Sequence, residues 1–221
     1  NFVVMLTLGM VLTSCQKENL ETIELTKGSN EESEGNINLT LIEPEGMERN
    51  TGCLMLPDAL YNKLPKDDEA LSTQALPSSV SLSCPSIRNQ GSEGSCVSFA
   101  VAYAARSILK KYKTGASYST STNTFSPEFV HNQIKLSNDC EDGTYIVDAL
   151  TLLMGAGVCT WSAMPYSSTN GCNQMPGSSA VTAAFGNRIT SFSSTTPCVS
   201  NIKSKLASNK PVIVAGPIDA N

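Results

Sequence analysis

Residues 87–100 read IRNQGSEGSCVSFA, and they are the most informative stretch of this chain because they place a cysteine at the start of an alanine-rich segment. Gly91 and Gly94 allow the backbone before Cys96 to turn tightly, and the residues after it predict a helix. A helix N-terminus offers unsatisfied N–H groups and a partial positive charge, which favour a thiolate over a thiol. The pattern therefore predicts that Cys96 is a nucleophile whose pKa lies below that of an ordinary thiol.

Gln90 precedes Cys96 by six residues, and the glycine-containing turn between them brings its amide toward the sulfur. The carboxamide N–H and the backbone N–H of Cys96 can then hold an oxyanion together. We therefore interpret Gln90 and Cys96 as a candidate catalytic pair.

This segment resembles the active-site segment of papain-like cysteine peptidases, which reads N-Q-G-x-x-G-S-C-[WVT]-[AS]-F-[AS] with the same spacing from glutamine to cysteine. Residues 76–80 resemble the mature start of such enzymes, residues 144–166 the helix and loop that follow, and residues 202–215 the helix and strand that lead toward the catalytic histidine. The resemblance implies an α+β fold of two lobes, a helical left lobe that carries the nucleophile and a right lobe like a β-barrel.

The same resemblance implies a mechanism and a substrate site. The Cys96 thiolate would attack a peptide carbonyl, and the acyl-enzyme would then be hydrolysed by water, without a cofactor. The substrate backbone would lie along Asp142, Gly143 and Thr144. The pocket for the side chain that precedes the scissile residue would be walled by Thr144, Tyr145 and, across the cleft, Ala215.

Three positions depart from the family pattern. Val97 replaces the usual aromatic residue after the nucleophile, and the substrate-binding loop has one glycine, Gly143, where the family has two. Glu93 stands where the family usually has a cysteine, so the family bridge at that place is absent. These departures indicate a divergent bacterial branch and leave the substrate preference open.

The general base is expected outside this chain. In the family the catalytic histidine follows the cysteine by about 130–150 residues, so it and its orienting asparagine are expected beyond residue 221. The fold is then incomplete at its C-terminal end, and this fragment alone is expected to be inactive. His131 is the one histidine present. It falls in a predicted helix over residues 126–134, which starts with an N-cap serine and a proline and whose family counterpart is structural.

The start of the chain predicts export. Residues 2–12 are an apolar run too short to span a bilayer and long enough for a signal-peptide core. Residues 12–15 read LTSC, which resembles the lipobox of bacterial lipoproteins and implies lipidation of Cys15 and a membrane anchor at the cell envelope. The alternative is an ordinary secretory signal in which Cys15 is incidental.

Charge divides the rest of the chain. Residues 16–76 hold 13 Asp and Glu against 5 Lys and Arg, whereas residues 77–221 hold 7 against 10. We therefore expect a signal peptide with its lipobox over residues 1–15, an acidic tether and pre-domain segment over 16–76, and the peptidase domain over 77–221. Residues 16–46 have little to bury and predict disorder. Residues 53–56 predict a short strand and residues 57–61 a helix, not the long helical inhibitory segment of many papain relatives.

Cysteines outside positions 15 and 96 number six, which allow three disulfides in 15 connectivities. No Cys-x-x-Cys pair or histidine cluster occurs, so no metal site is expected. The family resemblance implies a bridge between Cys140 and Cys172. Cys84 is a possible partner of Cys53, and Cys159 and Cys198 are interpreted as buried thiols.

Further elements follow from the apolar spacing. Residues 96–109 predict a buried helix that ends before residues 113–115, residues 145–154 a second helix and residues 201–208 a third. Residues 211–215 predict a buried strand.

The family resemblance implies a peptide or protein as the substrate. The sequence has no basic stripe with interleaved aromatic residues, so nucleic acid is not expected as a partner. Two other classes of function remain open. One is a catalytically inactive papain-fold protein that binds ligands at the cell surface. The other is a disulfide-stapled surface domain in which Cys96 is a buried core thiol.

Overall fold

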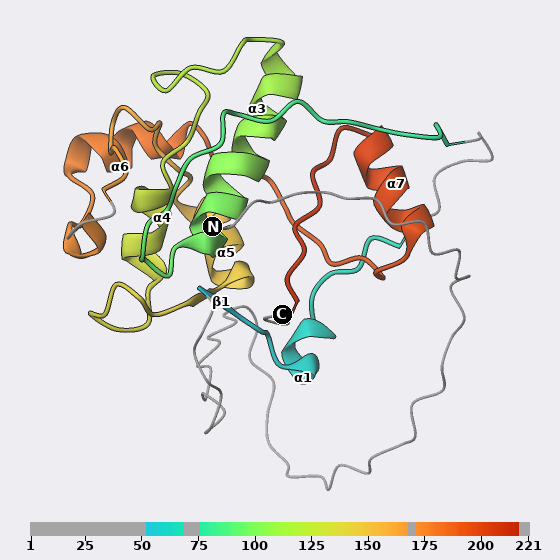
Figure 1. Ribbon diagram of the computed structural model, residues 1–221, viewed down its shortest axis with the longest axis horizontal. Coiled ribbons are helices and arrows are strands. Elements are labelled where there is room, and N and C mark those ends of the chain that lie inside the picture. Colours follow the sequence, from blue (N-terminus) through green and yellow to red (C-terminus); the bar gives the residue numbers. More distant parts are fainter. Residues whose placement is uncertain (1–51, 69–75, 168–170, 217–221) are drawn as a thin grey trace, which may run out of the picture. The chain divides into compact units, whose positions relative to one another are not determined.

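The computed structural model describes residues 52–68, 76–167 and 171–216, and all of them belong to one unit, residues 48–221. The expected signal peptide, Cys15 and the tether over 16–46 lie outside the described residues. The elements are two short strands and a series of helices (Figure 1). In the described ranges, no helix is long and apolar enough to cross a membrane.

The central helix begins at the candidate nucleophile. Segments α2 (Cys96–Ser98), η1 (Phe99–Arg106) and α3 (Ser107–Thr114) follow one another without a break. The middle segment, η1, is π-helical, a rare form that occurs frequently at functional sites. The helix ends at Gly115, whose φ of 71° lies in the left-handed region that glycine adopts at little cost. The predicted helix is confirmed and reaches one turn further than expected.

Helix α4 (Pro127–Ile134) confirms its predicted start. The Ser126 Oγ accepts a hydrogen bond from the Phe129 N–H at 3.1 Å, and Pro127 occupies the first turn. Phe125, Phe129 and Val130 are buried in the main hydrophobic cluster, which also includes Val97 and Val101 of the central helix. The core of the described chain therefore lies between α4 and the nucleophile helix.

Strand β2 (Thr144–Tyr145) leads directly into α5 (Ile146–Gly155), so the predicted second helix is confirmed with its start shifted by one residue. Strand β1 (Cys53–Leu54) pairs with β2 in parallel, with Cys53 opposite Thr144 and Leu54 opposite Tyr145. The short helix α1 (Asp58–Tyr61) follows β1. The predicted strand and helix of the pre-domain segment are thus both present.

Three helices complete the described chain: η2 (Gly171–Asn173), α6 (Ser178–Phe185) and α7 (Val199–Ala207). Figure 1 shows α4 and α6 to the left of the central helix and α7 to its right. Helix α7 confirms the prediction over 201–208, two residues earlier at its start. Helix α6 is not among the predicted elements; it buries only Ala180 and Ala184 on the core.

The strand predicted over residues 211–215 is wrong. These residues have no regular secondary structure, and Val214 is 77% exposed. Their apolar composition indicated burial, but a strand also needs a neighbouring strand for its backbone hydrogen bonds. The described chain provides none there. The α+β fold expected from the sequence is confirmed, with a helical lobe and few strands in the described ranges. Residues 211–215 add no strand of the expected right lobe.

The cysteines follow the sequence prediction in part. Cys140 and Cys172 form a disulfide with a Cα–Cα distance of 5.6 Å, as the resemblance implied. Cys159 is buried in the core. The suggested pairing of Cys53 with Cys84 is wrong, because Cys53 lies in β1 beside Thr144 while Cys84 is an exposed thiol whose Sγ lies 3.4 Å from the Leu82 carbonyl oxygen.

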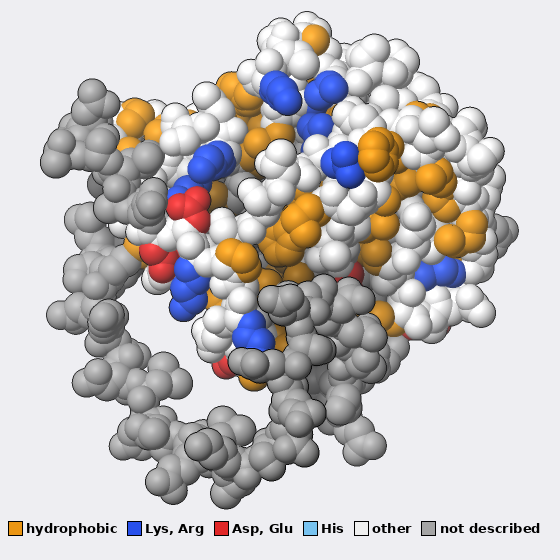
Figure 2. All heavy atoms as spheres, turned by 180° about the vertical axis from the view of Figure 1, so that it is seen from behind, with side chains coloured by type: hydrophobic (Ala, Val, Ile, Leu, Met, Phe, Trp, Pro, Cys, Tyr) orange, Lys and Arg blue, Asp and Glu red, His pale blue; other side chains and the backbone are white. Residues whose placement is uncertain are grey.

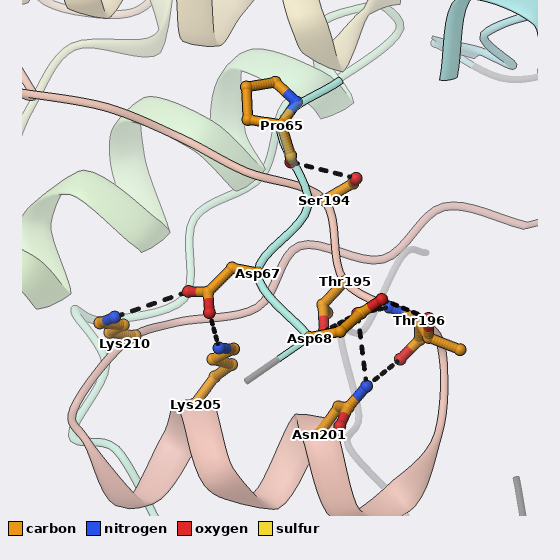
Figure 3. A network of polar contacts seen from close by, with 9 residues as sticks. All are labelled: Pro65, Asp67, Asp68, Ser194, Thr195, Thr196, Asn201, Lys205 and Lys210. Atoms are coloured by element: carbon orange, nitrogen blue, oxygen red, sulfur yellow. Dashed lines mark hydrogen bonds and ion pairs between the residues drawn. The ribbon is translucent and has the colours of Figure 1, made fainter. Parts of the chain in front are cut away.

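Residues 65–68 attach the pre-domain segment to α7 and the residues before it (Figure 3). Asp68 accepts hydrogen bonds from the Thr196 N–H at 2.6 Å and the Thr196 hydroxyl at 2.9 Å. Asp67 forms ion pairs with Lys205 at 2.5 Å and Lys210 at 3.7 Å. Residues on either side of the predicted domain start are therefore bound together.

Candidate active site

Cys96 is the first residue of the central helix and is half-buried. The Phe99 N–H donates to the Ser95 carbonyl oxygen at 3.0 Å, so regular helical hydrogen bonding starts immediately before the nucleophile. Ser95 is fully buried, and its hydroxyl does not cap the helix. The sequence prediction of a cysteine at a helix N-terminus is confirmed.

The predicted effect on the Cys96 thiol is reversed. Burial raises the pKa of Cys96 to about 11, and the nearby Cys53 thiol raises this pKa further. The backbone N–H groups of Val97 and Cys96 act in the expected direction and lower the pKa, but burial outweighs them. In this structure Cys96 is a thiol at neutral pH.

Gln90 lies in the turn before the nucleophile, where its Nε2 donates to the Glu93 carbonyl oxygen at 2.9 Å. Gly91 has a φ of 66° and its N–H donates to the Asn89 side chain at 2.9 Å, which explains the glycine in the turn. A carboxamide has two N–H donors, so one donor of Gln90 remains for an oxyanion.

Tyr166 holds this turn at both ends. Its hydroxyl donates to the Gln90 carbonyl oxygen at 2.7 Å, and Ser95 Oγ lies 2.7 Å from the same hydroxyl. The Tyr166 ring packs edge-on against Phe99 at 4.8 Å between centroids. The sequence analysis included Tyr166 only as the last residue of the range 144–166 that resembles the family, and it missed this role.

The turn before Cys96, residues 90–95, is called the nucleophile turn, and it lies against the predicted substrate-binding segment. The Gly94 N–H donates to the Cys140 carbonyl oxygen at 2.8 Å. A Cβ atom on Gly94 would lie 2.5 Å from the Glu141 carbonyl oxygen and closer still to that of Asp142, so only glycine fits here.

Gly143, Thr144 and Tyr145, the predicted substrate-binding residues, are buried. The Thr144 N–H donates to the Gly52 carbonyl oxygen at 3.2 Å, so β1 already occupies a backbone group of this segment. The structure thus brings the turn over residues 90–95 close to residues 143–145. Ala215 is half-buried in the irregular segment after α7, and its place on the opposite wall of the cleft stays a prediction.

His131 is 0% exposed on α4, and burial lowers the pKa of its imidazole to about 4. Among the described residues no hydrogen bond joins His131 to Cys96. A neutral imidazole closed off from solvent agrees with the structural role expected from the sequence.

Two carboxyl groups are buried near the nucleophile, one in the turn before Cys96 and one on α4. Glu93, at the position of the family cysteine, is 3% exposed, and burial raises its pKa. Glu128 on α4 is 2% exposed, and burial raises its pKa to about 7, with Glu93 adding to the shift. Glu128 Oε2 accepts a hydrogen bond from the Ser167 N–H at 3.3 Å. In the described part of the chain, no group of three or more acidic, cysteine or histidine side chains is arranged to hold a metal ion.

Two solved structures that match this chain are cysteine proteases. Xylellain, a cysteine protease from Xylella fastidiosa, matches with a TM-score of 0.53 and 20% sequence identity over 75% of this chain and 62% of that chain. A digestive procathepsin L2 proteinase from Tenebrio molitor larval midgut matches with a TM-score of 0.42 and 24% identity over 57% of this chain and 42% of that chain. This chain thus spans less than two thirds of either structure.

No curated protein matches the chain. The family model described as papain family cysteine protease matches residues 77–221, about two thirds of the sequence. The matched range begins where the sequence analysis placed the start of the peptidase domain. The chain therefore belongs to the papain family of cysteine proteases.

Proposed function

We propose that this chain is the nucleophile-bearing part of a cysteine endopeptidase, which hydrolyses peptide bonds through an acyl-enzyme on Cys96. In the proposed reaction Cys96 Sγ attacks the peptide carbonyl, and Gln90 and the Cys96 N–H hold the oxyanion. The leaving amine takes a proton from the general acid, and water then releases the acyl group. The histidine that serves as base and acid, and the asparagine that orients it, are proposed to lie beyond residue 221.

The observation that carries this proposal is the position of Cys96 as the first residue of the central helix, directly after the Gln90 turn. A thiol with a pKa of about 11 is a weak nucleophile at neutral pH. A neighbouring imidazolium would favour the thiolate by direct charge attraction, since an opposite charge within a few ångströms lowers a thiol's pKa. The proposed mechanism therefore depends on the downstream histidine.

The proposed substrate is a peptide or protein whose backbone lies along residues 143–145, with Ala215 on the opposite wall. The pairing of β2 with the extended strand β1 supports this assignment, because an extended peptide can pair with the same segment in place of β1. Nucleic acid is not a proposed partner. On the face drawn in Figure 2, basic side chains form small separate groups and no continuous stripe.

We further propose that the protein is exported and anchored to the cell envelope by a lipid on Cys15. This rests on the sequence LTSC after a short apolar run. Mass spectrometry of the N-terminal peptide from the membrane fraction tests it, because a lipidated Cys15 is the expected result and an unmodified one would contradict the anchor.

A second candidate is a catalytically inactive papain-fold protein that binds ligands at the cell surface. The raised pKa of Cys96 and the engagement of Gln90 by the Glu93 carbonyl favour it, since both describe a site that is not poised for attack. Activity of the full-length protein separates the two candidates.

The test uses full-length reduced protein and a fluorogenic peptide blocked at both ends. We expect hydrolysis that is lost in Cys96→Ala and falls about 10²–10³-fold in kcat for Gln90→Ala, the loss typical of one oxyanion donor. Gln174→Ala, which changes an exposed glutamine side chain, is the matched control and should leave the rate unchanged. Absence of hydrolysis in the reduced wild type would favour the inactive binding protein.

A further inference from the structure

We propose that Cys53 is a redox latch: it forms a reversible disulfide with Cys96 that holds β1 over the substrate-binding segment and blocks the nucleophile. The inference rests on the proposed peptidase function, because the latch regulates a reaction only if Cys96 carries it out.

Strand β1 occupies the place where a substrate would pair. Cys53 lies opposite Thr144 and Leu54 opposite Tyr145, and the Gly52 carbonyl oxygen accepts the Thr144 N–H at 3.2 Å. An extended substrate that pairs with this edge of residues 143–145 needs the Thr144 N–H, which the Gly52 carbonyl oxygen already occupies. The pre-domain segment and a substrate therefore exclude each other at this strand.

The same strand brings Cys53 to the nucleophile turn. A Cβ atom on Gly52 would lie 2.5 Å from the Gly94 carbonyl oxygen, so the two backbones are in direct contact one residue before Cys53 and two residues before Cys96. Both cysteine side chains are half-buried and pack against the main hydrophobic cluster. The Cys53 thiol also contributes to the raised pKa of Cys96, as expected for two ionisable groups close to each other.

The segment is attached at its other end as well. Asp68 binds Thr195 and Thr196, and Asp67 binds Lys205 and Lys210 (Figure 3). A segment bound at two places keeps Cys53 at a high effective concentration near Cys96. Closing the disulfide then costs little further ordering of the chain.

The chemistry needs an oxidant, and we assign that part to a small-molecule disulfide such as glutathione disulfide. The Cys96 thiolate attacks one sulfur of that disulfide and releases a thiolate; the Cys53 thiolate then attacks the Cys96 sulfur and releases the second. The two cysteines are oxidised to one disulfide, and the small disulfide is reduced to two thiols that take up the two protons. A dithiol reductant reverses both steps and frees Cys96.

The latch differs from the Cys140–Cys172 bridge in what it joins. That bridge connects two parts of the peptidase domain itself. A Cys53–Cys96 bond would connect the segment before the domain to its nucleophile, so breaking it would change the access to Cys96 and leave the bonds within the domain intact.

The experiment treats full-length protein with glutathione disulfide, alkylates the remaining thiols and maps the peptides without reduction. We expect a Cys53–Cys96 linked peptide, loss of Cys96 alkylation, and recovery of both alkylation and hydrolysis with dithiothreitol. Cys53→Ser should carry only a glutathione adduct on Cys96. Cys84→Ser, which removes an exposed thiol, is the control and should form the linked peptide like the wild type.

The outcomes separate this inference from the proposed function. A Cys96 glutathione adduct beside an alkylated Cys53 in the wild type, a Cys53–Cys84 linkage, or no reaction of either cysteine would each overturn the latch. If the reduced protein fails to hydrolyse peptides, the peptidase function is wrong, while the peptide map still decides whether the disulfide forms.

Discussion

Ser95 and Tyr166, 71 residues apart in sequence, meet at a hydroxyl–hydroxyl distance of 2.7 Å. The Tyr166 proton is donated to the Gln90 carbonyl oxygen, so the Ser95 hydroxyl is the donor of the pair. Tyr166, from the loop after α5, thereby fixes Gln90 and Ser95, the first and last residues of the turn before Cys96. The position of Gln90 relative to Cys96 depends on a residue outside the motif that contains both.

Tyr166→Phe removes this hydroxyl and keeps the ring against Phe99. Two hydrogen bonds are lost and the part-buried Gln90 carbonyl group is left without its donor, so we expect the unfolding free energy to fall by about 1–3 kcal/mol. In the full-length protein kcat should fall more than KM rises, because the oxyanion donor is misplaced. Urea unfolding and steady-state kinetics measure the two effects.

Tyr61→Phe is the control for Tyr166→Phe. The Tyr61 hydroxyl is exposed and donates to the Thr195 carbonyl oxygen at 3.4 Å, far from the turn. It should change neither stability nor kcat noticeably. If Tyr166→Phe behaved like Tyr61→Phe, the bridge would not position the turn.

Gly94→Ala tests the contact between the nucleophile turn and the substrate-binding segment. The new Cβ would collide with the carbonyl groups of Glu141 and Asp142, which are backbone atoms that cannot rotate away. We expect a loss of at least about 1–3 kcal/mol in unfolding free energy. Gly186→Ala is the matched control, since nothing lies within 4 Å of its Cβ position and its φ is −71°. That change should be neutral or stabilise the fold by about 0.4–1 kcal/mol.

Removal of the Cys140–Cys172 disulfide should lower the unfolding free energy by about 3–4 kcal/mol. This value follows from the loss of loop-closure entropy in the unfolded chain for a sequence separation of 32 residues. The double variant Cys140→Ser, Cys172→Ser is compared with Cys84→Ser by urea unfolding under non-reducing conditions. Cys84 is exposed, so its replacement should leave the midpoint unchanged. Equal midpoints for both variants would show that the bridge contributes nothing to stability.

The sequence predicted the features that local signals determine. A cysteine after a glycine-containing turn, and a serine and proline at a helix start, each specify backbone geometry within a few residues. The position of Cys96 and the start of α4 were therefore correct. The Cys140–Cys172 bridge came from the family resemblance, because six cysteines alone leave the pairing open.

The features missed are those that depend on contacts distant in sequence. Burial reversed the predicted direction of the Cys96 pKa, and burial is a property of everything packed around a side chain. The parallel pairing of β1 with β2 joins segments about 90 residues apart. Strands of two residues are too short to show a sequence pattern that would identify their pairing partner. Residues 211–215 have strand composition, but composition does not specify a pairing partner.

Glu128 should make stability depend on pH in a direction opposite to that of most carboxyl groups. Its pKa is raised from 4.5 to about 7 in the folded protein, mainly by burial. The folded state therefore keeps a proton that the unfolded state loses, and stability falls as pH rises from about 4.5 to 7. The full effect is on the order of 3 kcal/mol.

Glu128→Gln isolates this contribution, because it replaces the carboxyl group with a neutral side chain of similar shape. His131, with a lowered pKa of about 4, destabilises the fold as pH falls, and this contribution cancels when variant and wild type are compared at each pH. We expect the unfolding free energy of Glu128→Gln minus that of wild type to grow by up to about 3 kcal/mol between pH 5 and pH 8. Glu141→Gln, which makes the same change at an exposed side chain, is the matched control. A difference for Glu128→Gln that stays constant over this range would mean that the buried carboxyl group ionises at an ordinary pH.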